Sequence, residues 1–237
     1  MKRKDNFSKN LSLTGWLMVC LSVLQIIESL VVMFVNLLSQ IQSGVGDSQK
    51  TILSNIEKGL SESGTSFVDV LNQFEVIHLV ILIPMSFFVI SLFQNLKSYL
   101  NQIHKIFDLD LFLIIFVFSN IFLIMISSIM FLVGKGGVIE DVVGTISLVL
   151  LLVYLVFSIG FFIRINLLSF DFSGLKKQIF YLGMSYTILN IFRVFIPYSL
   201  SNIFTIVHFL FFLVSFSYWI CWSMFFFKSS KSLIESK

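Results

Sequence analysis

Hydrophobic residues occur in long runs along this chain, and charged or turn-forming residues separate the runs. A helix that crosses a bilayer needs about 20 mostly apolar residues, and six windows of the sequence meet that requirement. None of the windows shows the regular apolar–polar alternation of a membrane β-strand. The pattern therefore predicts an all-α polytopic membrane protein with six transmembrane helices in a bundle, over the approximate windows 13–38, 76–96, 111–133, 143–163, 179–197 and 203–227.

The connections between the windows are short, except for an extracellular loop of approximately residues 39–75. Its apolar residues recur at helical spacing in two groups, one before Gly64 and one from Phe67 to Phe74. The groups fit either two amphipathic helices on the outer membrane surface or extensions of the first two spans into a helical hairpin. The loop is too short for a separate folded domain, so we expect residues 1–237 to form a single membrane domain.

Composition supports a lipid environment, because 57% of the residues are hydrophobic and only 12% are charged. Soluble domains are about 45–50% apolar and about 25% charged. The first apolar run is too long for the core of a secretory signal and has no cleavage site after it, so we expect it to remain in the mature chain. The 29 Phe and 2 Pro, with abundant Ile, Leu, Ser and Lys, suggest a low-GC bacterium and hence its plasma membrane.

The distribution of basic residues predicts the orientation. If the N-terminus is inside, the inner segments hold 12 of the 16 Lys and Arg residues, and the outer loops hold Lys50, Lys58 and Lys135. The positive-inside rule then places both termini in the cytoplasm. Membrane orientation also explains the net charge of +3, so that charge does not indicate binding to nucleic acid.

Polar residues inside the windows are the candidate functional residues. Glu28 and Arg193 are the charged ones, both in the outer half of the predicted bundle. A charge near the bilayer centre costs about 2.5–3.5 kcal/mol, so we expect both to face the interior and to pair. The full candidate cluster is Glu28, Arg193, His208, His78, Gln25, Asn190 and Asn120.

The polar residues also lie on helix faces, and such faces have a second interpretation. Ser22, Gln25, Ser29 and Asn36 recur at helical spacing in the first window. Transmembrane helices use faces of this kind for close packing and interhelical hydrogen bonds, so a purely structural role remains open. In the second window, Pro84 removes a backbone donor and predicts a helix kink.

No motif indicates catalysis, and we predict that the chain is not an enzyme. The sequence contains no HExxH, no Walker A sequence, no CxxC and no serine-nucleophile motif. Cys20 and Cys221 both lie in apolar windows and suggest no metal site. No cofactor is predicted, and no filter motif of an ion channel is present.

The leading functional hypothesis is a non-catalytic, transport-related subunit or accessory, such as a permease or immunity-type component. Its expected partners are the lipid bilayer and another membrane protein or an ATPase subunit. One alternative is a scaffold or assembly factor that binds another membrane protein. A weaker alternative is a proton-coupled transporter of small solutes that uses Glu28 and the histidines.

Overall fold

The structure is a computed structural model that describes residues 2–42, 67–133, 138–195 and 201–235. Within these ranges all regular structure is helical, so the all-α prediction is confirmed. The long helices are α1 (Lys2–Gln42), α3 (Phe67–Tyr99), α4 (Asp110–Val133), α5 (Val138–Leu167), α6 (Lys176–Phe195) and α7 (Ser201–Glu235). A short π-helix, η1 (Leu100–His104), and a short 3-10 helix, η2 (Phe172–Gly174), lie between them.

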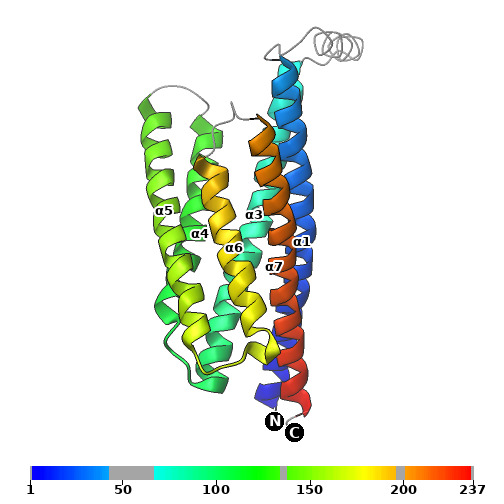
Figure 1. Cartoon of the computed structure of the whole chain (residues 1–237), viewed down its shortest axis with the longest axis vertical. Helices are drawn as coiled ribbons and strands as arrows, with labels where there is room; N and C mark the ends of the chain where they lie inside the picture. Colours follow the sequence, from blue (N-terminus) through cyan, green and yellow to red (C-terminus); the bar gives the residue numbers. More distant parts are fainter. Residues whose placement is uncertain (1, 43–66, 134–137, 196–200, 236–237) are drawn as a thin grey trace.

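The long helices run side by side along the long axis of the molecule (Figure 1). α1 packs on α3, α3 on α4, α4 on α5, α5 on α6 and α6 on α7, and α7 returns to pack along α1 in the most extensive contact. The order of the helices along the chain is therefore also their order around the bundle. The contact between α1 and α7 brings the two termini to the same end (Figure 1).

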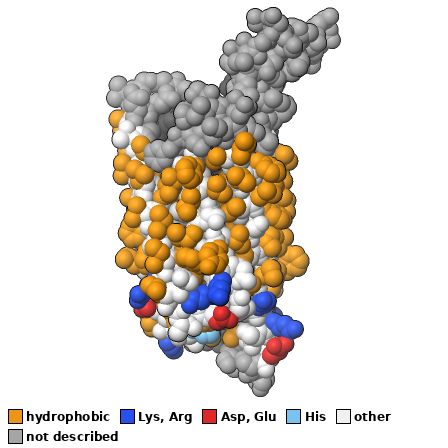
Figure 2. All heavy atoms as spheres, in the orientation of Figure 1, with side chains coloured by type: hydrophobic (Ala, Val, Ile, Leu, Met, Phe, Trp, Pro, Cys, Tyr) orange, Lys and Arg blue, Asp and Glu red, His pale blue; other side chains and the backbone are white. Residues whose placement is uncertain are grey.

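Three of the helices contain stretches long and apolar enough to cross a membrane within the described residues, namely Asn6–Ile27, Leu148–Leu167 and Ile206–Glu235. They support the assignment to membrane proteins. On the face shown in Figure 2, hydrophobic side chains cover the middle of the molecule, and charged side chains gather toward the end where the termini lie. Membrane crossing by the remaining helices stays a prediction.

Aromatic side chains fill much of the core. Phe93 on α3, Phe116 on α4 and Phe161 on α5 are fully or almost fully buried, with ring centroids 4.8 Å apart for Phe93–Phe116 and 5.2 Å apart for Phe116–Phe161. Phe162, also on α5, contacts α6. Gly183 on α6 has no side chain at this contact, so α5 and α6 approach closely. Contact area and shape complementarity of this kind hold neighbouring helices of the bundle together.

Two observations bear on the connecting segments. The second apolar group of the predicted loop, from Phe67 to Phe74, belongs to α3, as the hairpin-extension interpretation expects; the first group lies outside the described residues. Pro84 lies inside α3, and the kink expected there stays a prediction.

Two irregular segments reverse the chain at the end that carries the termini. Lys105, which follows η1, has a φ of 57°, and the segment between α5 and α6 contains Phe172, Ser173 and Gly174 with φ values of 51°, 57° and 79°. Left-handed backbone is unfavourable for residues other than Gly, so the surrounding contacts must stabilise these turns. Phe172 is completely buried and supplies one such contact.

Candidate functional site

The structure describes only part of the predicted polar cluster. The side chains of three members lie outside the described part of the chain: Glu28, His78 and Arg193. The other four come from four different helices: Gln25 on α1, Asn120 on α4, Asn190 on α6 and His208 on α7. Asn190 and His208 are half-buried. The pairing predicted for Glu28 and Arg193 therefore stays a prediction.

Gln25 and Asn120 both make hydrogen bonds that serve the fold. The Trp219 indole Nε1 on α7 donates to Gln25 Oε1 at 2.8 Å, and both residues are buried. Asn120 Nδ2 donates to the Phe116 carbonyl oxygen, one turn earlier on its own helix, at 2.8 Å. Because a buried amide needs a hydrogen-bond partner, these bonds explain how the bundle accepts the two residues.

The bond between Gln25 and Trp219 lies beside stacked aromatic rings. Tyr186 on α6 stacks on Tyr218 on α7 with ring centroids 5.1 Å apart, and Trp219 meets both tyrosines edge-on. Tyr218 and Trp219 are 3% exposed. The polar face predicted on the first span is thus occupied, at Gln25, by a contact with α7.

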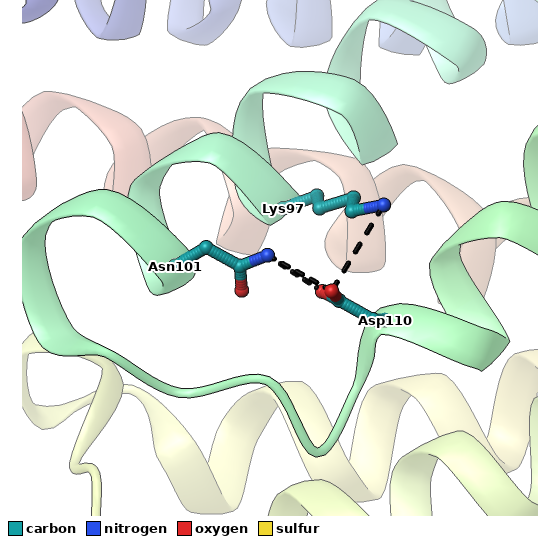
Figure 3. Close-up of polar contacts among 3 residues, drawn as sticks. All are labelled: Lys97, Asn101 and Asp110. Atoms are coloured by element: carbon teal, nitrogen blue, oxygen red, sulfur yellow. Dashed lines mark hydrogen bonds and ion pairs between the residues drawn. The ribbon is translucent and has the colours of Figure 1, made fainter.

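A second polar cluster, which the hydropathy pattern did not indicate, lies at the end of the molecule that carries the termini. Asn101 Nδ2 donates to both carboxylate oxygens of Asp110, at 2.9 and 3.0 Å, and Lys97 Nζ lies 3.9 Å from Asp110 Oδ2 (Figure 3). Lys97 is near the end of α3, Asn101 is in η1 and Asp110 begins α4. The cluster joins the two sides of the turn, and a carboxylate in the first turn of α4 also suits the helix dipole.

Aromatic and polar contacts connect the same turn to α7 and to the segment between α5 and α6. The His104 ring lies 4.3 Å from the Phe170 ring and 4.9 Å from the Tyr99 ring, measured between centroids. Burial lowers the pKa of His104 below its usual range. Burial raises the pKa of Tyr99, and hydrogen bonds with Ser229 and Ser232 partly oppose that rise.

The surface at the charged end contains ion pairs. Arg164 Nη2 on α5 lies 2.9 Å from Asp108 Oδ2, and both side chains are about half exposed. No group of three or more His, Cys, Asp and Glu residues in the described part of the chain is placed to hold a metal ion. Segment 97–110 of the sequence contains the residues of the cluster of Lys97, Asn101 and Asp110. The sequence does not reveal that they pair, because their pairing depends on how the turn folds.

Comparison with known protein families, with curated proteins and with solved structures found no match to the chain. Function is therefore inferred from the geometry of the molecule itself.

Proposed function

We propose that this chain is a six-span plasma-membrane protein with both termini in the cytoplasm. In this proposal it acts as a non-catalytic subunit or accessory of a transport-related membrane complex. The observation that carries the proposal is how the described interior polar groups are used. Several of them join one helix to another, as between Gln25 and Trp219, or between Asn95 Nδ2 and Thr14 Oγ1 at 2.9 Å. Others, such as Asn120, bond to a carbonyl of their own helix.

Because packing contacts occupy the described interior, we infer that the protein acts through contacts of its outer surface with other molecules. Buried aromatic rings fill the space between α3, α4 and α5, and the polar groups of α1 and α7 contact each other. The outer surface is strongly apolar, with Val80, Leu111, Val156 and Leu167 each more than 60% exposed. Large exposed apolar surfaces mark contact with lipid or with another membrane protein.

The proposed orientation has support from the charges of the described side chains. Eight are basic and four are acidic: Lys9, Lys97, Lys105, Arg164, Lys176, Lys177, Lys228 and Lys231 against Asp108, Asp110, Asp171 and Glu235. Figure 2 shows charged side chains gathered beyond the hydrophobic band, at the end of the termini. An excess of Lys and Arg is the mark of a cytoplasmic face.

A scaffold or assembly factor is the second candidate, because the same helix-to-helix use of polar groups supports it equally. The two candidates differ in the partner, which is a transport complex with an ATPase subunit in the first and a different integral membrane protein in the second. A proton-coupled transporter would depend on Glu28, His78 and His208, and it is the third candidate.

Two experiments test the proposal. Cysteines introduced at Ser63 and Gly136, in a chain without Cys20 and Cys221, should react with an impermeant thiol reagent in intact cells. A cysteine at the exposed position Asp171 should react only after the cells are opened. Labelling at position 171 in sealed cells would contradict the orientation.

The second experiment is purification in mild detergent from the organism that encodes the chain, followed by mass spectrometry. A stoichiometric ATPase partner supports the transport-related role, and a different integral membrane protein supports the scaffold. A chain that purifies alone and moves a solute in liposomes would contradict both.

A further inference from the structure

Ion pairs neutralise only some of the cations at the charged end. Within the described part of the chain, Lys97 pairs with Asp110, Arg164 with Asp108 and Lys231 with Glu235. Three other lysines surround the turn between α5 and α6 and form no ion pair with a described residue: Lys176, Lys177 and Lys228. We call these three residues the basic patch.

Contacts with the turn hold two of the three ammonium groups close to it. Lys176 Nζ donates to the Leu168 carbonyl oxygen, and Lys228 Nζ on α7 lies 3.4 Å from the Ser173 carbonyl oxygen. Lys177 follows directly and is exposed. The turn itself contains one carboxylate, Asp171, so the patch and the turn together carry a net charge of about +2 at neutral pH.

Two lysines of the basic patch lie where the helix dipole of α6 adds to their positive charge. Lys176 and Lys177 lie in the first turn of the helix, where the helix dipole is positive and favours an anion. A pair of lysines at that position is unfavourable for the isolated chain. An anion bound from outside would reverse the sign of this effect, since it would interact favourably with the lysines and with the helix terminus together.

An exposed apolar stripe continues from the patch along α6. Tyr181, Ile188 and Phe192 follow Lys177 at spacings of four, seven and four residues, which places all four on one helix face. The three apolar residues are 64%, 43% and 52% exposed. At about 1.5 Å per residue, Ile188 lies about 16 Å from Lys177, close to half of a hydrocarbon core that is about 30 Å thick.

We propose that the basic patch binds the phosphate of an anionic phospholipid of the cytoplasmic leaflet, with an acyl chain along the stripe on α6. A soluble phosphate would use the same lysines, but only a lipid uses the charge and the adjoining apolar stripe together. The proposal rests on the proposed orientation. Basic groups at the cytoplasmic ends of membrane helices are suited to anionic headgroups, and each Lys near such a surface contributes about fivefold in affinity.

The test uses the purified full-length chain in detergent. Native mass spectrometry and thermal unfolding are measured with phosphatidylglycerol, with phosphatidylcholine of the same acyl chains, and with glycerol 3-phosphate. The patch variant is Lys177→Gln with Lys228→Gln. The control is Lys9→Gln with Lys105→Gln, which removes the same charge from exposed lysines that have no described contact with the turn.

We expect phosphatidylglycerol to be retained and to raise the unfolding temperature of the natural chain and the control. The patch variant should bind it about 30-fold more weakly. Lys177→Gln alone has no described hydrogen bond to lose and should weaken binding about fivefold, so the proposal stays testable if the double variant is unstable. Equal effects of the two phospholipids, or full binding by both variants of the patch, would overturn the proposal.

An effect of glycerol 3-phosphate equal to that of phosphatidylglycerol would also overturn it, in favour of a site for a soluble anion. Failure here leaves the proposed membrane role intact, because that role is tested separately by cysteine labelling in cells. Conversely, labelling that contradicts the orientation would move the patch to the outer face and overturn the assignment to the cytoplasmic leaflet, while lipid binding by the purified chain would be unaffected.

Discussion

Gln25 on α1 accepts a hydrogen bond from the indole of Trp219 on α7, 194 residues later in the chain, at 2.8 Å. Both residues are buried. This bond connects the helix that begins the chain with the helix that ends it, along the most extensive contact in the bundle.

We expect Gln25→Leu to destabilise the protein by about 1–3 kcal/mol, because it leaves the buried indole N–H without a partner. Trp219→Phe should also destabilise it, through the lost ring contacts and the unpaired amide. The double variant should be less damaging than the sum of the two, because neither polar group is then left alone. Unfolding in detergent measures all three, with Ser217→Ala on the exposed face of α7 as the control. Strict additivity would show that the bond contributes nothing.

Gly183→Ala should destabilise the protein, although alanine is the better helix former by about 1 kcal/mol. A Cβ at Gly183 would overlap the ring of Phe162 on α5, and overpacking of this kind costs about 1–3 kcal/mol. Adding Phe162→Leu should restore part of the loss. The comparison is Ser185→Ala on the exposed side of the same helix. A Gly183→Ala protein that unfolds at a higher temperature than the natural chain would show that α5 and α6 are not in this contact.

Cysteines at Ser8 and Ser230 should form a disulfide under mild oxidation. The two hydroxyl oxygens are 2.9 Å apart, and each hydroxyl can also bond the carbonyl of the other residue. Side chains this close fit the short separation that a disulfide requires. The experiment uses a chain without Cys20 and Cys221, and mass spectrometry of peptides detects the link. The pair Ser8→Cys and Ser232→Cys should link poorly, because Ser232 is exposed; equal linking of both pairs would count against the packing of the termini.

Acidification should destabilise the protein through His104. Burial lowers the pKa of this imidazole, so the unfolded chain binds the proton more readily than the folded chain does. Stability is therefore full above the unfolded pKa of about 6.5 and falls as the pH drops through the interval between the two values. We expect the unfolding temperature of the natural chain to decrease more between pH of about 7.5 and about 5.5 than that of His104→Gln. Parallel curves for the two proteins would contradict this assignment.

Glu28→Gln and Arg193→Gln should each lower stability or function, because each leaves the other charge unpaired within the membrane. For a buried pair the loss is about 3–5 kcal/mol. The double substitution should be less harmful than the sum, and a double-mutant cycle in detergent measures the difference. Simple additivity would show that the two charges do not meet, and would remove the support that the proposed transporter role takes from them.

The amino-acid sequence was sufficient for the class of protein and the approximate positions of the helices. A helix in lipid must satisfy its backbone within one segment, so its signal is local, and an apolar run such as 143–163 falls inside α5. The helices at both termini extend beyond the predicted transmembrane windows. α1 begins at Lys2 and α7 ends at Glu235, because contacts between the two helices, including the bonds between Ser8 and Ser230, support turns whose own composition is polar.

Only the tertiary structure decided which polar residues meet. Gln25 was a candidate for either a functional cluster or helix packing, and its partner is Trp219, an aromatic residue that has no polar periodicity to reveal it. The cluster of Lys97, Asn101 and Asp110, and the approach of Lys228 on α7 to the turn before α6, both depend on segments with left-handed residues. Hydropathy and residue spacing indicate the secondary structure that one segment favours. These contacts instead depend on which of the six long helices in the described part of the chain pack against each other.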